Sequence, residues 1–103
     1  AAAHITGGGL TENLPRVLPE GLAARIDLGA WSLPPVFRWI ERGTALDDAE
    51  MLRTFNCGIG MVLVVAEDRA EALSTLLSEM GETVLTLGAV APGEGVVYSG
   101  TLA

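Results

Sequence analysis

The stretch His4-Ile5-Thr6-Gly7-Gly8-Gly9-Leu10 places a polar start and three glycines directly before a segment with helical periodicity. Apolar residues then recur at the spacing of one helix face, at Leu10, Leu14, Val17 and Leu18. A glycine-rich loop that enters a helix suits an anion, because free backbone N–H groups point outward and the helix dipole favours negative charge. The pattern predicts a loop over 1–9, a helix over 10–18 and a phosphate site where they join. A plain turn is the alternative interpretation.

The composition describes one small, apolar domain. Half of the 103 residues are apolar, and the mean hydropathy is +0.43. A domain of this size cannot bury so much apolar surface, so we expect an apolar face that meets another domain or subunit. The longest apolar run, Met61–Ala66, is too short to cross a membrane, and no secretory leader is visible. We therefore expect a cytoplasmic protein without a membrane partner.

Charge and cysteine usage exclude several classes of site. The net charge is −7, and the six basic residues are scattered arginines, which excludes the basic footprint that nucleic-acid binding needs. The single cysteine, Cys57, rules out an internal disulfide and suits a reducing compartment. Asp47, Asp48 and Glu50 resemble metal ligands, but their place in the first turn of a helix explains them better. We therefore predict no metal site in this chain.

The remaining pattern alternates strands and helices, which predicts an α+β fold with a mixed sheet packed against helices. The expected strands are 23–28, a buried central strand over 61–65, 83–90 and 95–99. The expected helices run from Pro34-Pro35 to Gly43, over 45–54 behind a capping box at Thr44–Asp47, and over 68–80. The helix over 68–80 carries an apolar stripe and is a candidate crossover between parallel strands.

A second unusual stretch, Arg53–Met61, puts small polar residues and two glycines between a helix and a strand. A tight turn in which Asn56 and Gly58 take unusual backbone angles is favoured over a ligand-binding role. We interpret Cys57 as a small buried apolar residue, because a nucleophile would need a base beside it. Trp31 and Trp39 are interpreted as core or interface residues rather than stacking platforms.

Together these stretches resemble a known family. The matching residues occur in this order at family spacing: His4–Leu10, Glu12–Pro19, Trp39, Glu50–Met51 and Arg53–Met61. They resemble the C-terminal part of aminoimidazole ribonucleotide synthetase, also called phosphoribosylformylglycinamidine cyclo-ligase. The resemblance covers essentially the whole chain, as the later portion (1–103) of that domain. We therefore expect the N-terminal ATP-binding domain and the start of the C-terminal domain to lie outside this chain, which alone is expected to be inactive.

The resemblance implies a reaction in de novo purine synthesis. ATP phosphorylates the formyl amide oxygen of formylglycinamidine ribonucleotide, the amidine nitrogen attacks the activated carbon, and phosphate leaves. Aminoimidazole ribonucleotide is the product. The family implies ATP and Mg²⁺ as cofactors, bound mostly outside this chain, and a homodimer as the assembly.

Site residues follow by carrying over matching positions. The resemblance places the glycine loop in the cleft, with substrate-binding residues Thr6, Gly7, Gly8, Gly9 and Asn13. It makes His4 the candidate catalytic residue, which would donate to a phosphate or shuttle a proton. The alternative for His4 is a residue that only holds the loop by hydrogen bonding. For Asn13 the alternative is a helix hydrogen bond.

Two other functions remain open at this point. One is another ATP-using relative, such as formylglycinamidine ribonucleotide synthetase, selenophosphate synthetase, thiamine-monophosphate kinase or a hydrogenase maturation factor. The other is a non-catalytic assembly module that keeps the loop for anion binding only.

Overall fold

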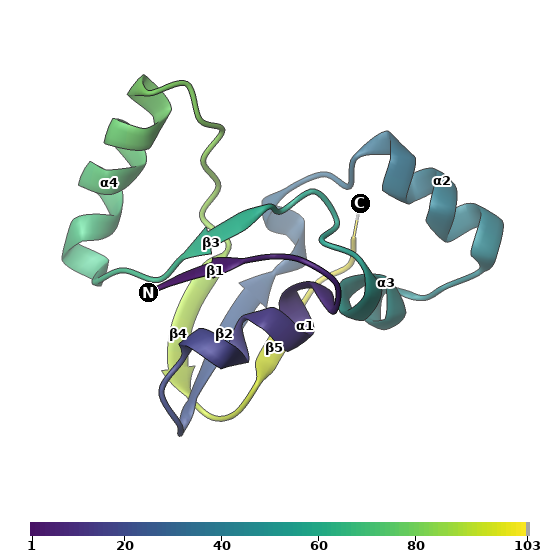
Figure 1. Cartoon of the computed structure of the whole chain (residues 1–103), viewed down its shortest axis with the longest axis horizontal. Coiled ribbons are helices and arrows are strands. Elements are labelled where there is room, and N and C mark those ends of the chain that lie inside the picture. Colours follow the sequence, from purple (N-terminus) through teal and green to yellow (C-terminus); the bar gives the residue numbers. More distant parts are fainter. Residues whose placement is uncertain (103) are drawn as a thin grey trace.

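Residues 1–102, which the computed structural model describes, form two small sheets surrounded by helices (Figure 1). The strands are β1 (Ala2–His4), β2 (Leu22–Asp27), β3 (Met61–Leu63), β4 (Gly88–Pro92) and β5 (Val96–Ser99). The α-helices are α1 (Gly9–Asn13), α2 (Pro35–Thr44), α3 (Asp48–Thr54) and α4 (Glu67–Glu79). Two 3₁₀ helices follow α1 and β2, namely η1 (Pro15–Val17) and η2 (Leu28–Ala30). The α+β class is therefore confirmed.

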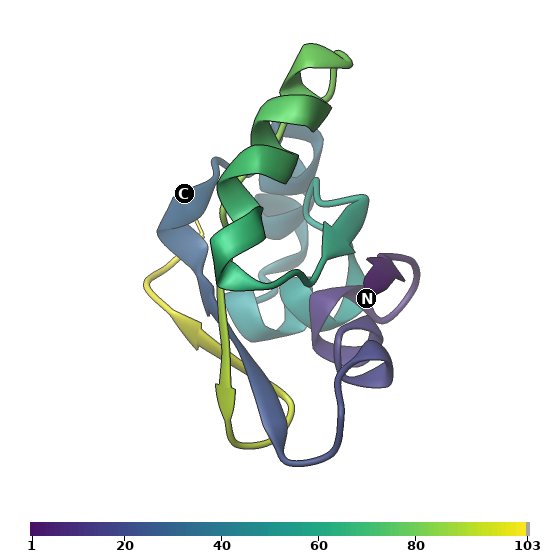
Figure 2. The same ribbon diagram turned by 90° about the vertical axis from the view of Figure 1, so that its left-hand side faces the viewer.

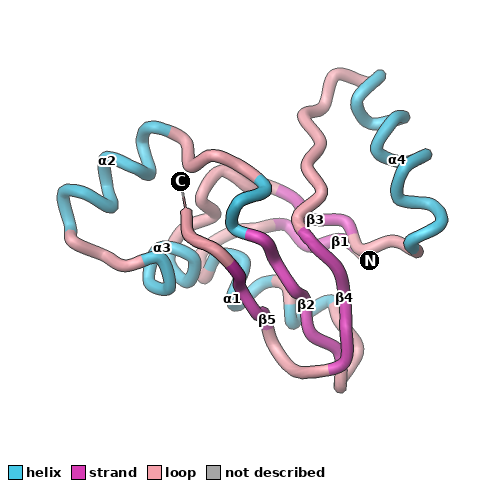
Figure 3. The backbone as a smooth tube through the Cα atoms, turned by 180° about the vertical axis from the view of Figure 1, so that it is seen from behind, coloured by secondary structure: helices cyan, strands magenta, loops and turns pink. Residues whose placement is uncertain are grey.

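The larger sheet has the strand order β4-β2-β5. β2 pairs antiparallel with β4, where Ala24 faces Val90, and parallel with β5, where Ala24 faces Val96. Figure 3 shows the three strands side by side from behind. The expected strand over 23–28 is confirmed, and so is a mixed sheet that contains one parallel pair.

The core lies where α1, α3 and the stretch after α3 meet. Its fully buried side chains are Leu10, Leu14, Met51, Leu52 and Cys57. Trp31 adds a buried ring to the same cluster, as expected for a core residue. Burial of these apolar groups is the main force that holds the two helices together.

The N-terminal residues form a strand where we predicted only loop. β1 pairs antiparallel with β3, so that Ala3 lies opposite Val62 and His4 opposite Met61. Ala3 is buried while His4 is exposed, as the alternation of a strand requires. The sequence carries too short an apolar pattern here to reveal a three-residue strand.

The predicted helix over 10–18 is interrupted. α1 ends at Asn13, and the chain continues as the 3₁₀ helix η1 from Pro15. Pro15 lacks the backbone N–H that a continuing α-helix would need, which explains the change of helix type.

The predicted start of one helix is also wrong. α3 begins at Asp48, and the Asp47 carboxylate accepts the Glu50 backbone N–H at 2.9 Å, so Asp47 rather than Thr44 is the cap. Thr44 instead ends α2, and its hydroxyl donates to the Ile40 carbonyl. α4 begins at Glu67 after Ala66 and has no side-chain cap.

The predicted central strand and its following helix lie at the surface. β3 pairs only with β1, and Met61 at its start is 58% exposed. No residue of α4 is buried, although its stripe includes Leu76 and Met80. α4 connects β3 of one sheet to β4 of the other, so it is not a crossover within one sheet. Figure 2 shows α4 extending away from the three-stranded sheet.

The last predicted helix-to-strand connection is longer than expected. Residues 83–87 are not strand, and β4 begins only at Gly88. β4 can start there because glycine lets its backbone lie against the Arg25 carbonyl, where a side chain would collide. None of the helices in residues 1–102 has both the length and the apolar character that a membrane span requires.

Candidate functional site

The fold brings the two unusual stretches of sequence together. The backbone N–H of Ile5 donates to the Gly60 carbonyl at 2.9 Å, beside the β1–β3 pair. Gly9 lies directly against the carbonyl groups of Leu52 and Phe55, where any Cβ would overlap them. The glycine loop and the stretch after α3 therefore form one continuous surface, although they are far apart in sequence.

Asn13 holds the glycine loop in shape. It is buried, and its side-chain amide donates to the carbonyl groups of Gly9 at 2.8 Å and Gly7 at 3.3 Å. The Gly9 N–H donates to the Thr6 carbonyl at 3.0 Å and closes the turn. Gly8 and Gly9 both have positive φ, of 96° and 60°, which glycine adopts without strain. Asn13 thus makes local hydrogen bonds, which was our alternative interpretation of this residue.

The three glycines face different surroundings. A Cβ at Gly8 would collide with the Glu12 side chain, so the carboxylate of Glu12 lies over this part of the loop. Gly7 has no unusual φ, and a Cβ there would meet nothing within 4 Å. The case for a phosphate site at Gly8 is therefore weaker than the sequence suggested. The Glu12 carboxylate would repel an anion there, and α1 has only five residues. Gly7 is the glycine that faces open space.

Two hollows adjoin the joined stretches. The first, which we call the histidine cleft, has a volume of about 510 Å³ and is lined by His4, Gly58, Ile59, Gly60, Met61, Glu82, Thr83, Leu85 and Leu87. The second, the phenylalanine hollow, has a volume of about 310 Å³ and is lined by Ile5, Thr6, Gly7, Phe37, Thr54, Phe55 and Asn56. His4 and the Thr6–Gly7 pair therefore line different hollows of one surface. Gly8, Gly9 and Asn13 shape the loop behind them.

Cys57 is a structural residue, as predicted. Its thiol is buried and donates to the Met51 carbonyl at 3.5 Å, while the Trp31 indole donates to the Cys57 carbonyl at 3.0 Å. Burial, assisted by the negative charges of Glu41 and Asp48, raises the pKa of the Cys57 thiol to about 11. The thiolate is therefore scarce at neutral pH, and Cys57 is a poor nucleophile.

The turn after α3 confirms the prediction for Gly58 but not for Asn56. Positive φ occurs at Cys57 and Gly58, with values of 53° and 96°. Asn56 contributes through its side chain instead, because its carbonyl oxygen accepts the Gly58 N–H at 2.8 Å. The sequence therefore indicated the tight turn and the role of Gly58, but not that Cys57 would adopt a positive φ.

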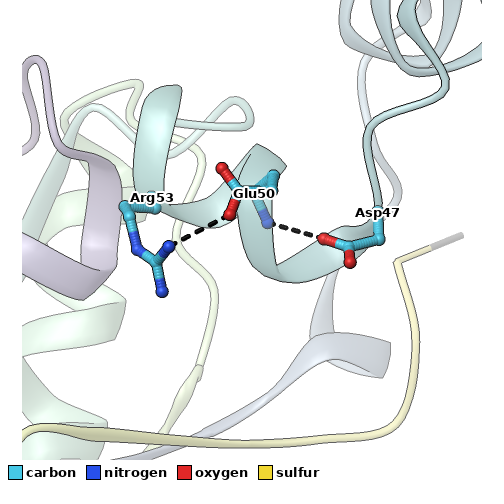
Figure 4. A network of polar contacts seen from close by, with 3 residues as sticks. All are labelled: Asp47, Glu50 and Arg53. Carbon is cyan, nitrogen blue, oxygen red and sulfur yellow. Dashed lines mark hydrogen bonds and ion pairs between the residues drawn. The ribbon is translucent and has the colours of Figure 1, made fainter.

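The acidic residues at the start of α3 belong to the helix. Figure 4 shows the Asp47 carboxylate on the Glu50 backbone N–H and the Glu50 carboxylate paired with Arg53 at 3.0 Å. Within residues 1–102, no three His, Cys, Asp or Glu side chains gather where they could hold a metal ion. The helix-capping interpretation of these acids is confirmed for Asp47.

Sequence reasoning missed several residues that line or adjoin this surface. Phe37 and Phe55 come together in the phenylalanine hollow with ring centroids 6.0 Å apart. Glu41 has a buried carboxylate oxygen without a hydrogen-bond partner among the described residues, and burial followed by the adjacent Asp48 carboxyl raises its pKa. Nothing local to the sequence shows which residues meet across helices, so the contact between Phe37 and Phe55 could not be predicted.

Comparisons with known proteins agree with this architecture. Residues 1–99 match the family model described as "AIR synthase related protein, C-terminal domain". A solved structure, thiamine-monophosphate kinase from Stenotrophomonas maltophilia K279a, matches the whole chain with a TM-score of 0.68 and 22% sequence identity. The chain spans 32% of that protein's length, and at this identity the likeness shows the fold alone. The family match covers nearly all of the chain, which therefore belongs to the C-terminal domains of the AIR synthase related proteins.

Proposed function

We propose that this chain is the later portion of the C-terminal domain of an aminoimidazole ribonucleotide synthetase. Together with an N-terminal ATP-binding domain, it closes the imidazole ring of formylglycinamidine ribonucleotide. The main observation behind the proposal is that the two motif stretches lie in contact. The Ile5 N–H donates to the Gly60 carbonyl, and Gly9 packs against the Phe55 backbone. The family match over residues 1–99 supports it.

The reaction needs an activated carbonyl carbon. The formyl amide oxygen takes the γ-phosphoryl group of ATP and becomes a phosphate ester, which leaves readily. The amidine nitrogen then attacks the carbon, the C–O bond breaks, and inorganic phosphate departs with the electron pair. A base must remove the proton from the attacking nitrogen.

We assign that proton transfer to His4. Its side chain is exposed at the histidine cleft, and imidazole exchanges protons near neutral pH. Thr6 and the backbone of Gly7 are assigned to substrate contacts, because both reach the surface beside this cleft. Gly8, Gly9 and Asn13 support binding by holding the loop in its conformation. The described residues offer no metal-ligand set, so the Mg²⁺ that accompanies ATP is assigned to the rest of the enzyme.

The proposal includes two protein partners, the N-terminal domain and a second subunit. Their binding would cover apolar side chains that stand exposed on β3, α4 and the segments beside them, namely Met61, Leu63, Val65, Leu76, Met80 and Leu85. Exposed apolar surface of this extent supports a binding face.

The test is an assay on the chain joined to the N-terminal domain, with formylglycinamidine ribonucleotide, ATP and Mg²⁺. We expect ATP-dependent formation of aminoimidazole ribonucleotide and none from residues 1–103 alone. Phosphorylation of thiamine monophosphate in a parallel assay, without ring closure, would overturn the proposal in favour of a kinase. Binding of inorganic phosphate without turnover of either substrate would favour a non-catalytic module.

The role of His4 is tested by His4→Gln, which keeps hydrogen-bonding groups but cannot exchange a proton near pH 7. We expect kcat to fall by roughly 10²-fold or more with KM little changed, which is the effect of losing a general base. The matched control is Gln in place of Glu20, an exposed residue of the turn before β2. A rise in KM alone would show that His4 only positions the loop.

A further inference from the structure

The phenylalanine hollow differs from the histidine cleft in its chemistry. The histidine cleft has two titratable side chains, His4 and Glu82. The phenylalanine hollow is lined by aromatic, hydroxyl and amide side chains and by no charged one. A phosphate group in this hollow would therefore have no opposite charge to bind, whereas an uncharged ring would lose little hydration.

The base of the hollow presents aromatic surface. Phe37 from α2 and Phe55 after α3 stand with ring centroids 6.0 Å apart and planes tilted by 56°. Both residues are only partly buried, so part of each side chain stays exposed. Ile5, which also lines the hollow, is buried. A flat ring placed here would stack against the aromatic side chains, as nucleobases do on phenylalanine.

The rim of the hollow holds hydrogen-bonding groups that the described residues leave unused. Thr54 is exposed and lines the hollow, so its hydroxyl is accessible to a ligand. Asn56 uses its side-chain oxygen for the Gly58 N–H, which leaves its NH₂ group available to a ligand acceptor. Thr6 donates only a long bond of 3.4 Å to Asn13, so its oxygen can still accept.

Gly7 at the rim keeps the hollow open. Its backbone does not require glycine, and a Cβ there would meet nothing within 4 Å. The absence of a side chain leaves room for a ligand to approach the backbone closely. The volume of about 310 Å³ is at the lower end of ligand pockets, so the hollow accommodates one ring rather than a whole nucleotide.

We propose that the phenylalanine hollow binds an uncharged ring of a nucleoside, stacked beside Phe37 and Phe55 and hydrogen-bonded to Thr54 and Asn56. The phosphates of the same nucleotide would lie outside the hollow. That the ligand is a nucleotide rests on the proposed function, whose product, aminoimidazole ribonucleotide, carries a flat imidazole ring on its ribose. The preference for an uncharged ring rests on the hollow itself.

The experiment is a titration of the ¹⁵N-labelled chain with three probes, namely adenosine, methyl β-D-ribofuranoside and inorganic phosphate. We expect saturable shifts in the amide resonances of Gly7, Thr54 and Asn56 with adenosine. Shifts with adenosine and not with the riboside would support a stacked base, whereas equal shifts with the riboside, which has no flat ring, would overturn the stacking. No saturable shift at these residues with either probe up to about 10 mM, the weak range expected for a single ring, would overturn the proposal. So would shifts there with phosphate alone.

A pair of matched variants checks the contact. Thr54→Val preserves shape and removes the hydroxyl, and we expect adenosine to bind roughly threefold to tenfold more weakly, the loss typical of one hydrogen bond. Thr75→Val makes the same change on exposed α4, outside the hollow, and is expected to leave the dissociation constant unchanged. Equal dissociation constants for the two variants would show that the Thr54 hydroxyl does not bind the ligand. Ring binding without cyclisation activity would contradict the proposed enzyme function but would still support the ligand site in the phenylalanine hollow.

Discussion

Two helices of this small domain, α3 and α4, differ strongly in how much of their surface is buried. α3 buries Met51 and Leu52 against α1, with both side chains at or below 1% exposure. α4 is the longest helix, yet it buries none of its residues, and Leu76 is 53% exposed. Figure 1 shows α3 among the other elements and α4 at one end of the molecule. The α3 side carries a core of its own, whereas the α4 side leaves apolar side chains exposed.

The largest test of this contrast compares truncations on the two helices. Leu52→Ala should lower the free energy of unfolding by about 2–5 kcal/mol, because it leaves a cavity in a packed core. Leu76→Ala should change it by less than about 0.5 kcal/mol, as for other surface positions. Denaturant titration followed by tryptophan fluorescence measures both values. Similar losses for the two variants would mean that α4 is packed as tightly as α3.

A second test examines how the glycine loop is seated on α3. Gly9→Ala should cost about 1–3 kcal/mol, because the methyl group would collide with the carbonyls of Leu52 and Phe55 at a positive φ. Gly7→Ala is the matched control in open space and should leave stability unchanged or raise it by up to about 1 kcal/mol. Thermal unfolding of both variants gives the comparison. A stable Gly9→Ala variant would show that the loop can move away from α3 at little cost.

A smaller effect is expected from the unfavourable electrostatics of Glu41, on the well-packed side. Burial and the neighbouring Asp48 carboxyl raise the pKa of Glu41 above its usual value of 4.5. A raised pKa in the folded state means that the contribution of Glu41 to stability is complete below the usual pKa. It is lost as pH rises through the raised one. Glu41→Gln, which stays neutral, should therefore be more stable than the original chain at pH 7.

The same variant has a defined pH profile. The advantage of Glu41→Gln should shrink as pH falls from the raised pKa toward 4.5, and it should be absent below that value, where the original carboxyl is protonated in both states. Glu20→Gln, an exposed carboxylate in a turn, serves as the control and should show no such trend. The profile is measured as the free energy of unfolding at pH values from 3 to 8, in steps of about one pH unit. An advantage that does not depend on pH would assign the effect to packing rather than charge.

Much of the secondary structure could be predicted from local pattern. The strand over 23–28 and the helices over 45–54 and 68–80 appear within a few residues of their expected bounds, because periodicity and proline or glycine punctuation act locally. Helix starts were less reliable. Thr44 and Asp47 are both good caps, and because α2 extends through Thr44, Asp47 is the residue that caps α3.

The candidate site could be predicted only in part. The glycine stretch and Arg53–Met61 were visible as unusual sequence, and the family match supports reading them together. That Glu12 lies over Gly8, that Asn13 serves the loop, and that Phe37 meets Phe55 required the tertiary structure. Each depends on the placement of side chains from segments that sequence spacing does not relate.

By itself, the sequence determined the kinds of element, the buried character of Cys57, and the two motif stretches that resemble a family. Tertiary structure decided which apolar faces became core. An apolar stripe reports only that a face prefers burial, so α3 and α4 look alike in sequence. Burial requires a partner surface within reach, and in this chain α1 supplies one to α3 whereas α4 meets none among residues 1–102. The tertiary structure likewise decided the pairing of β1 with β3, because these strands lie far apart in sequence and their contact closes a long stretch of chain.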